Sequence, residues 1–222
     1  MVFEDKRICF IHIPKCGGTS VSTAYLKILA KKEKPISRLT YAQKSWSAGL
    51  EAKTSRIIGR DNSRQTLYNM HASYDKYYPV YRDYKFITQV RNPITRFASI
   101  WKHLSSIDLV DTSFVKWVPR AIGALREGHW AKSLDNHEQY IQMLSCVNPM
   151  FDASLLLKHQ FLYVAGGEVE VHKLEEGTIW EAAGLIKRHE NNSAPIWKGE
   201  WTKENKILVR DYYERDFEKF GY

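Results

Sequence analysis

The segment Phe10–Ser20, FIHIPKCGGTS, decides the fold expected for this chain. Residues 7–13 are rich in β-branched and aromatic side chains and end at a proline, which predicts a buried strand. Apolar residues then recur at steps of three and four from Thr19 to about Lys32, which predicts an amphipathic helix. We therefore expect a strand, a tight loop and a helix in succession.

The loop between this strand and helix has the composition of an anion-binding turn. Glycines let the backbone approach a ligand closely, and a helix N-terminus offers exposed N–H groups and positive potential. A lysine adds a full charge, the cysteine is interpreted as a small loop residue, and two hydroxyls can donate hydrogen bonds. The alternative is an ordinary strand-to-helix turn with a surface lysine. The predicted binding residues are Lys15, Cys16, Gly17, Gly18, Thr19 and Ser20.

The order of residues in this loop differs from that of ATP-dependent enzymes. In the motif GxxxxGK[ST] the lysine follows the glycines, and the Ser or Thr after it binds magnesium. Here Lys15 precedes both glycines and the loop is shorter. The pattern disfavours an ATPase of that type.

A second strand, loop and helix are predicted further along the chain. Residues 84–90, YKFITQV, form the strand, and Asn92-Pro93 supplies the cap and first turn of a helix through about Ser105. Arg91 again places a cation at a strand end. The helix is predicted to have a polar face made of Asn92, Arg96, Ser99 and His103, on which Ser99 could share an anion with Arg91. The alternative, favoured for this stretch by itself, is an ordinary amphipathic helix with a solvated face. His103 is predicted to be in solvent, with a place near the substrate as its alternative.

Two such units predict an α/β fold for a single domain spanning residues 1–222. We expect a P-loop-like, three-layer domain in which helices flank a central, mainly parallel sheet. The remaining predicted elements are a helix at 135–146, strands at 161–164 and 169–174, and a last helix at 203–217. The acidic residues near the start of the third helix are interpreted as cap and surface charges.

Composition limits the partners and the compartment. The sequence has 33 Lys and Arg against 25 Asp and Glu, a net charge of +8, which favours anionic partners without selecting one. Three cysteines without a CxxC pair argue against a disulfide framework and a zinc site. No apolar run reaches the roughly 18 residues of a membrane span. We expect a soluble cytoplasmic protein, the alternative being a Golgi lumenal catalytic fragment.

Both loops resemble motifs of one enzyme family. FIHIPKCGGTS is similar to the 5′-phosphosulfate loop, and VRNPITRFASIW to the 3′-phosphate motif, of sulfotransferases that use 3′-phosphoadenosine 5′-phosphosulfate (PAPS). The likeness is strongest to the branch that includes the heparan-sulfate 2-O and chondroitin/dermatan sulfotransferases. The stretches HENNS, KHQFLY and RDYYERDFEKFGY are similar to late segments of that branch.

The resemblance implies a role for each loop. Lys15, the following Gly17 and Gly18, and the hydroxyls of Thr19 and Ser20 would hold the 5′-phosphosulfate, without a metal. Arg91 and Ser99 would hold the 3′-phosphate, and Asn191 and Ser193 of HENNS would add contacts to the nucleotide. The product would be adenosine 3′,5′-bisphosphate (PAP). The acceptor would be a hydroxyl of an anionic glycan or a small molecule, bound by loops at 33–64 and 108–132.

Transfer to a hydroxyl requires a group that accepts its proton, and neutral imidazole has a suitable pKa near pH 7. His71 follows an apolar run that is predicted to be a strand, so it would lie at a strand end on the nucleotide side. It also matches the histidine base of the resembled branch. His12 is instead predicted to be packed within the first strand. Lys15 would stabilise charge on the leaving phosphate.

Other classes stay open at this stage. A nucleotide kinase using ATP and magnesium is disfavoured by the early lysine. A basic nucleic-acid-binding module would use Lys and Arg on phosphates and aromatic rings on bases, but most aromatic residues here lie in core-like patterns. A catalytically inactive relative that keeps the nucleotide site is a further alternative.

Overall fold

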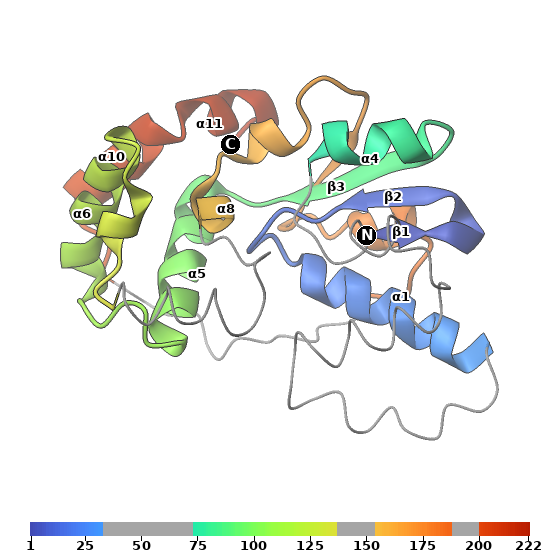
Figure 1. The fold of residues 1–222 in the computed structure, drawn as a ribbon, viewed down its shortest axis with the longest axis horizontal. Coiled ribbons are helices and arrows are strands. Elements are labelled where there is room, and N and C mark those ends of the chain that lie inside the picture. The colour runs from blue at the N-terminus through green and yellow to red at the C-terminus, as the bar shows by residue number, and fades with distance from the viewer. Residues whose placement is uncertain (33–72, 137–153, 188–199) are drawn as a thin grey trace. The chain divides into compact units, whose positions relative to one another are not determined.

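The computed structural model describes residues 1–32, 73–136, 154–187 and 200–222 (Figure 1). These residues fall into two compact units, which we describe separately. The first unit contains described residues 1–13, 17–32, 73–89 and 163–187, and the second contains 14–16, 90–136, 154–162 and 200–222. That all of them belong to one domain stays a prediction.

The first unit is built on a mixed sheet in the order β1-β2-β3-β4. Its strands are β1 (Val2–Phe3), β2 (Ile8–Ile11), β3 (Lys85–Val90) and β4 (Glu170–Lys173). β1 pairs with β2 in antiparallel and β2 with β3 in parallel. β2 and β3 are the two strands that the apolar runs predicted, and β4 confirms the expected strand near residue 170. A short helix, α9 (Ile179–Ala182), follows β4.

Helices cover both faces of this sheet (Figure 1). In α1 (Gly18–Lys32), Tyr25 stacks on Phe3 with ring centroids 4.0 Å apart. In α4 (Tyr74–Tyr81), Tyr74 meets Phe86 edge-on at 4.7 Å. Phe3 and Phe86 pair with consecutive residues of β2, so their side chains point to opposite faces. The predicted α/β class with helices on both sides of a sheet is confirmed.

The second unit is helical. Its helices are α5 (Pro93–Ser106), α6 (Phe114–Arg126), α8 (Ser154–Leu157), α10 (Lys203–Tyr212) and α11 (Glu214–Phe220), with a 3₁₀ turn at Trp130–Ser133. Asn92 caps α5 by accepting a hydrogen bond from the Ile94 N–H at 3.0 Å, as the sequence predicted. Phe97, Trp117 and Tyr213 are fully buried and pack together in the core of this unit.

Several sequence-based expectations are wrong in detail. The predicted strand at 161–164 is largely a 3₁₀ turn, Gln160–Tyr163. The carboxylate of Asp216 in α11 accepts the first two backbone N–H groups of this turn, so they are not free to pair in a sheet. The expected loop at 108–132 contains α6, which packs against α10. The last helix is interrupted at Tyr213, whose buried hydroxyl donates to the Leu157 carbonyl at 2.6 Å. The helix expected at 135–146 lies almost wholly outside the described residues.

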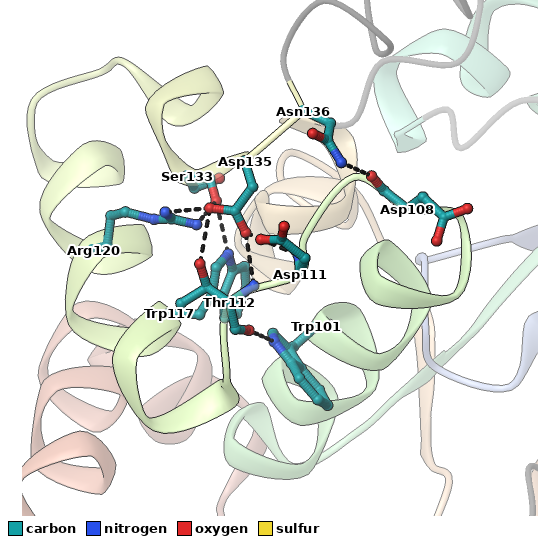
Figure 2. A network of polar contacts seen from close by, with 9 residues as sticks. All are labelled: Trp101, Asp108, Asp111, Thr112, Trp117, Arg120, Ser133, Asp135 and Asn136. Carbon is teal, nitrogen blue, oxygen red and sulfur yellow. Dashed lines mark hydrogen bonds and ion pairs between the residues drawn. The ribbon is translucent and has the colours of Figure 1, made fainter.

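A polar network joins the loop after α5 to α6 (Figure 2). Asp135 accepts hydrogen bonds from the backbone and hydroxyl of Thr112, each at 2.9 Å, and forms an ion pair with Arg120. Burial by itself would raise the pKa of Asp135, but the hydrogen bonds from Arg120 and Thr112 bring it well below its usual range. Asp135 is therefore a structural anchor, and its interpretation as a cap or surface charge is wrong.

None of the helices in the described ranges is both long enough and apolar enough to cross a membrane.

Candidate functional site

The loop after β2 has a strained backbone. β2 ends at Ile11, a turn covers residues 14–17, and α1 begins at Gly18. Lys15 has φ of +63°, a left-handed conformation that L-residues seldom adopt, and Gly17 has φ of +79°. A non-glycine residue held in this region costs energy that is commonly tolerated at functional sites.

In the first unit, the two loop glycines leave no room for a side chain. A Cβ on Gly17 would lie 2.8 Å from Leu174 Cδ1 and 3.0 Å from Gln89 Oε1. A Cβ on Gly18 would lie 2.2 Å from the ring of His12. Because β2 ends at Ile11, His12 lies just beyond the strand, and its predicted place within the strand is wrong. Its ring packs against Gly18, the first residue of α1. Its imidazole is half-buried beside the predicted anion-binding turn.

In the second unit, Lys15 lies beside another cation. The Arg91 guanidinium donates to the Lys15 carbonyl at 3.4 Å and to the Thr95 hydroxyl at 3.0 Å. Burial lowers the pKa of Lys15 to about 8, and the charge of Arg91 acts in the same direction. No carboxylate among the described residues forms an ion pair with Lys15. Two neighbouring cations, one of them half-buried without a described counter-ion, make this region a candidate anion site.

His103 belongs to the same electrostatic environment. It lies in the last turn of α5, where burial, and then the charge of Lys15, lower its pKa to about 4. Its predicted exposure to solvent is wrong, and it is a neutral imidazole at pH 7. Ser99 is half-buried one turn earlier, and none of the hydrogen bonds described for Arg91 joins it to Ser99.

Arg96 does not belong to a polar, solvated face. Its side chain is 1% exposed, and it donates to the Pro14 carbonyl at 3.1 Å and the Leu156 carbonyl at 2.8 Å. Helical periodicity grouped it with polar neighbours, but buried backbone carbonyls next to it supply the acceptors that an arginine needs. Arg96 thus fastens the turn to α5 and α8.

Gln160 is a buried residue of this region that the sequence did not identify as functional. Its side-chain amide bonds to the backbone of Arg91 and to the Cys16 thiol. Asp216 of α11, also fully buried, holds the backbone of Gln160 in turn. The only sequence signal was the likeness of KHQFLY and RDYYERDFEKFGY to family segments, which assigned no role to either residue.

Apart from Ser99, the predicted site residues divide into three groups. Lys15, Cys16 and Arg91 lie together in the second unit. Gly17, Gly18, Thr19 and Ser20 form the end of the turn and the first turn of α1 in the first unit. His71, Asn191 and Ser193 lie outside the described residues. Within the described ranges, no cluster of three or more His, Cys, Asp or Glu residues could hold a metal ion.

Comparison with known protein families identifies the family of this chain. A model of the sulfotransferase family matches residues 1–154. The match covers more than half of the 222 residues, and it includes both cationic loops. The chain belongs to the sulfotransferase family. No curated protein and no solved structure matched this sequence.

Proposed function

We propose that the chain transfers a sulfuryl group from PAPS to a hydroxyl of a carbohydrate or small molecule. The observation that carries the proposal is the pair of neighbouring cations, Lys15 and Arg91, at the ends of two strand-loop segments of a sulfotransferase-family chain. PAPS bears a 5′-phosphosulfate and a 3′-phosphate, so it requires positive charge at two places. The likeness of both loops to the heparan-sulfate 2-O and chondroitin/dermatan branch supports a glycan acceptor.

The residues present fit such a donor. An ammonium that is half-buried near a guanidinium is stabilised by a polyanion, because the anion replaces lost hydration and offsets the repulsion between the cations. Lys15, with the backbone of Gly17 and Gly18 and the hydroxyls of Thr19 and Ser20, would hold the 5′-phosphosulfate. Arg91 and Ser99 would hold the 3′-phosphate, and Asn191 and Ser193 would contact the nucleotide.

Lys15 would also act in the chemical step. Transfer displaces the sulfuryl group in line from the phosphate, and negative charge builds on the bridging oxygen that leaves. A fixed ammonium near that oxygen stabilises the charge more in the transition state than in the ground state, without a metal. His71 would accept the proton of the attacking hydroxyl.

A transfer assay with labelled PAPS tests this proposal across glycans, phenols and small alcohols. We expect Lys15→Ala to lower turnover by about 10²–10³-fold and to weaken PAP binding, because it removes a charge from the leaving oxygen. His71→Ala should lower turnover by about 10²–10⁴-fold while PAP binding is retained. Lys203→Ala, which removes an exposed cation of α10, is the matched control and should leave both quantities unchanged.

Calorimetry separates this function from ATP chemistry. Wild-type protein should bind PAP and should bind ATP with magnesium more weakly, since the loop lacks the lysine and hydroxyl order of ATP-dependent enzymes. Tight binding of ATP-magnesium without binding of PAP would refute the proposed donor. Wild-type turnover in His71→Ala would refute only the assignment of the base.

A further inference from the structure

Gln160 connects the two segments that carry the site cations. It is fully buried in the 3₁₀ turn Gln160–Tyr163, and its side chain lies between the backbone of Arg91 and the turn that contains Cys16. A buried amide has both donors and acceptors to satisfy, so its hydrogen bonds fix its neighbours as well as itself. Every contact used below lies within the second unit.

The amide of Gln160 holds both polar groups of one backbone residue. Gln160 Oε1 accepts from the Arg91 N–H at 2.9 Å, and Gln160 Nε2 donates to the Arg91 carbonyl at 2.8 Å. Arg91 directly follows β3, so Gln160 supplies the pair of hydrogen bonds that a neighbouring strand would supply. Only one orientation of the amide satisfies both bonds, and this orientation also lets Oε1 accept from the Cys16 thiol at 3.1 Å.

Gln160 is itself held from a distant part of the chain. The two carboxylate oxygens of Asp216 accept the backbone N–H groups of Gln160, at 2.9 Å, and of Phe161, at 2.8 Å. Asp216 is fully buried in α11. A carboxylate bound at both oxygens fixes the 3₁₀ turn firmly, because charge-assisted hydrogen bonds are the strong ones.

The turn at residues 14–16 is also held by two arginines. Arg96 holds the Pro14 carbonyl, and Arg91 holds the Lys15 carbonyl. Residues 14–16 are thus bound to the segment that begins at Arg91 by donors on both of these arginines and by the amide of Gln160. Gln160 therefore helps to fix the backbone that carries Lys15 relative to the backbone that carries Arg91.

We propose that Gln160, anchored by Asp216, is a positioning residue that sets the spacing of Lys15 and Arg91 for a ligand with two anionic groups. The inference rests on the proposed function, since it assigns Gln160 to the binding of the same donor. A shift of about 1 Å in a charged group is enough to weaken a preorganised site strongly. Gln160 itself would touch neither the reacting atoms nor the ligand.

Gln160→Met tests the proposal, because methionine has a similar length and volume but cannot form these hydrogen bonds. The matched control is Asn205→Leu, which removes another buried amide of the second unit, one that donates to the Val115 carbonyl at 3.0 Å, far from both loops in sequence. We expect both variants to lower Tm. Only Gln160→Met should weaken PAP binding, by about tenfold, as expected for the loss of two or three hydrogen bonds that position a site.

Hydrogen exchange provides a readout that needs no ligand. In Gln160→Met the backbone amides of Lys15, Cys16 and Arg91 should exchange faster, while those of α10 should not. Gln160→Asn keeps an amide but shortens its reach by one methylene, so it should also speed exchange at these residues, and it covers the case in which Gln160→Met does not fold.

The outcomes distinguish this inference from the proposed function. Unchanged exchange at Lys15, Cys16 and Arg91, or PAP affinity equal to that of wild type, would overturn the positioning role alone. An equal loss of PAP affinity in Asn205→Leu would also overturn it, since the effect would then be general destabilisation. Absence of PAP binding by the wild-type protein, with faster exchange in Gln160→Met, would refute the donor and leave the positioning of the two cations supported.

Discussion

At the scale of single residues, the main feature is a cation in an unfavourable position. Lys15 has a left-handed backbone, is half-buried and lies beside Arg91, and each of these conditions costs free energy in the absence of a ligand. Such a cost is explained if an anion occupies the place. A fully exposed lysine, the alternative interpretation of this turn, would not have its pKa lowered by burial.

The lowered pKa of Lys15 predicts how binding depends on pH. With a pKa of about 8 in the free protein, Lys15 is protonated at pH 7 and loses its proton as pH rises. PAP affinity should therefore be constant from about pH 7 to the free-protein pKa and fall above it, because bound anion favours the ammonium. Calorimetric titrations across this range measure the effect, and Lys15→Ala should give weak binding that does not change there.

The lowered pKa of Lys15 also predicts how the stability of the free protein depends on pH. Stability should rise with pH, whereas PAP affinity falls. Because the folded-state pKa lies below the ordinary value of 10.5, the charged ammonium destabilises the free protein at pH 7, and this penalty disappears as pH rises between the two values. Lys15→Met should accordingly raise Tm at pH 7 while PAP binding is weakened. A lower Tm in Lys15→Met would contradict the lowered pKa.

At the scale of elements, the sequence predicted the features that local signals determine and missed those that long-range contacts determine. The strand-loop-helix at residues 8–32 and the Asn92 cap of α5 follow from apolar spacing and turn chemistry, and both were predicted. The 3₁₀ turn at Gln160 was mistaken for a strand, because its backbone is held by Asp216, 56 residues away. The burial of Arg96 was missed for the same reason, since its acceptors are backbone carbonyls distant in sequence.

The hydrogen bonds and ion pair of Asp135 are expected to stabilise the second unit. Asp135→Asn removes the negative charge that pairs with Arg120 and accepts the Thr112 N–H. Because Arg120 is left partly unpaired, the free energy of unfolding should fall by about 2–4 kcal/mol. Since the pKa of Asp135 is depressed in the fold, its contribution is present above the ordinary value near 3.8 and is lost as pH falls below it.

Urea unfolding at pH 7 measures this contribution, and repeating it near pH 3 tests the sign. The matched control is Glu127→Gln, which breaks an ion pair with Lys132 in which both side chains are more than half exposed. That change should have little or no effect on the free energy of unfolding, because water screens an exposed ion pair. Equal effects of the two substitutions would show that Asp135 is no anchor.

At the scale of the whole molecule, ligand binding should appear as stabilisation. A ligand that binds only the folded state at 100 times its Kd adds about 2.7 kcal/mol, which corresponds to a Tm increase of roughly 5–10 °C for a chain of this size. PAP should produce this shift and ATP-magnesium a smaller one, measured by scanning calorimetry. A shift of the same size in Lys15→Ala would mean that PAP binds elsewhere.

The sequence by itself determined the α/β class, the two cationic loops and the sulfotransferase resemblance, because strands, turns, caps and loop composition depend on residues close together in the chain. Only the tertiary structure decided that Lys15 and Arg91, 76 residues apart, lie together, that Arg96 is buried, and that Gln160 and Asp216 hold this arrangement. These contacts arise when distant segments pack and satisfy one another's buried polar groups, and no local pattern records which partner each group will find.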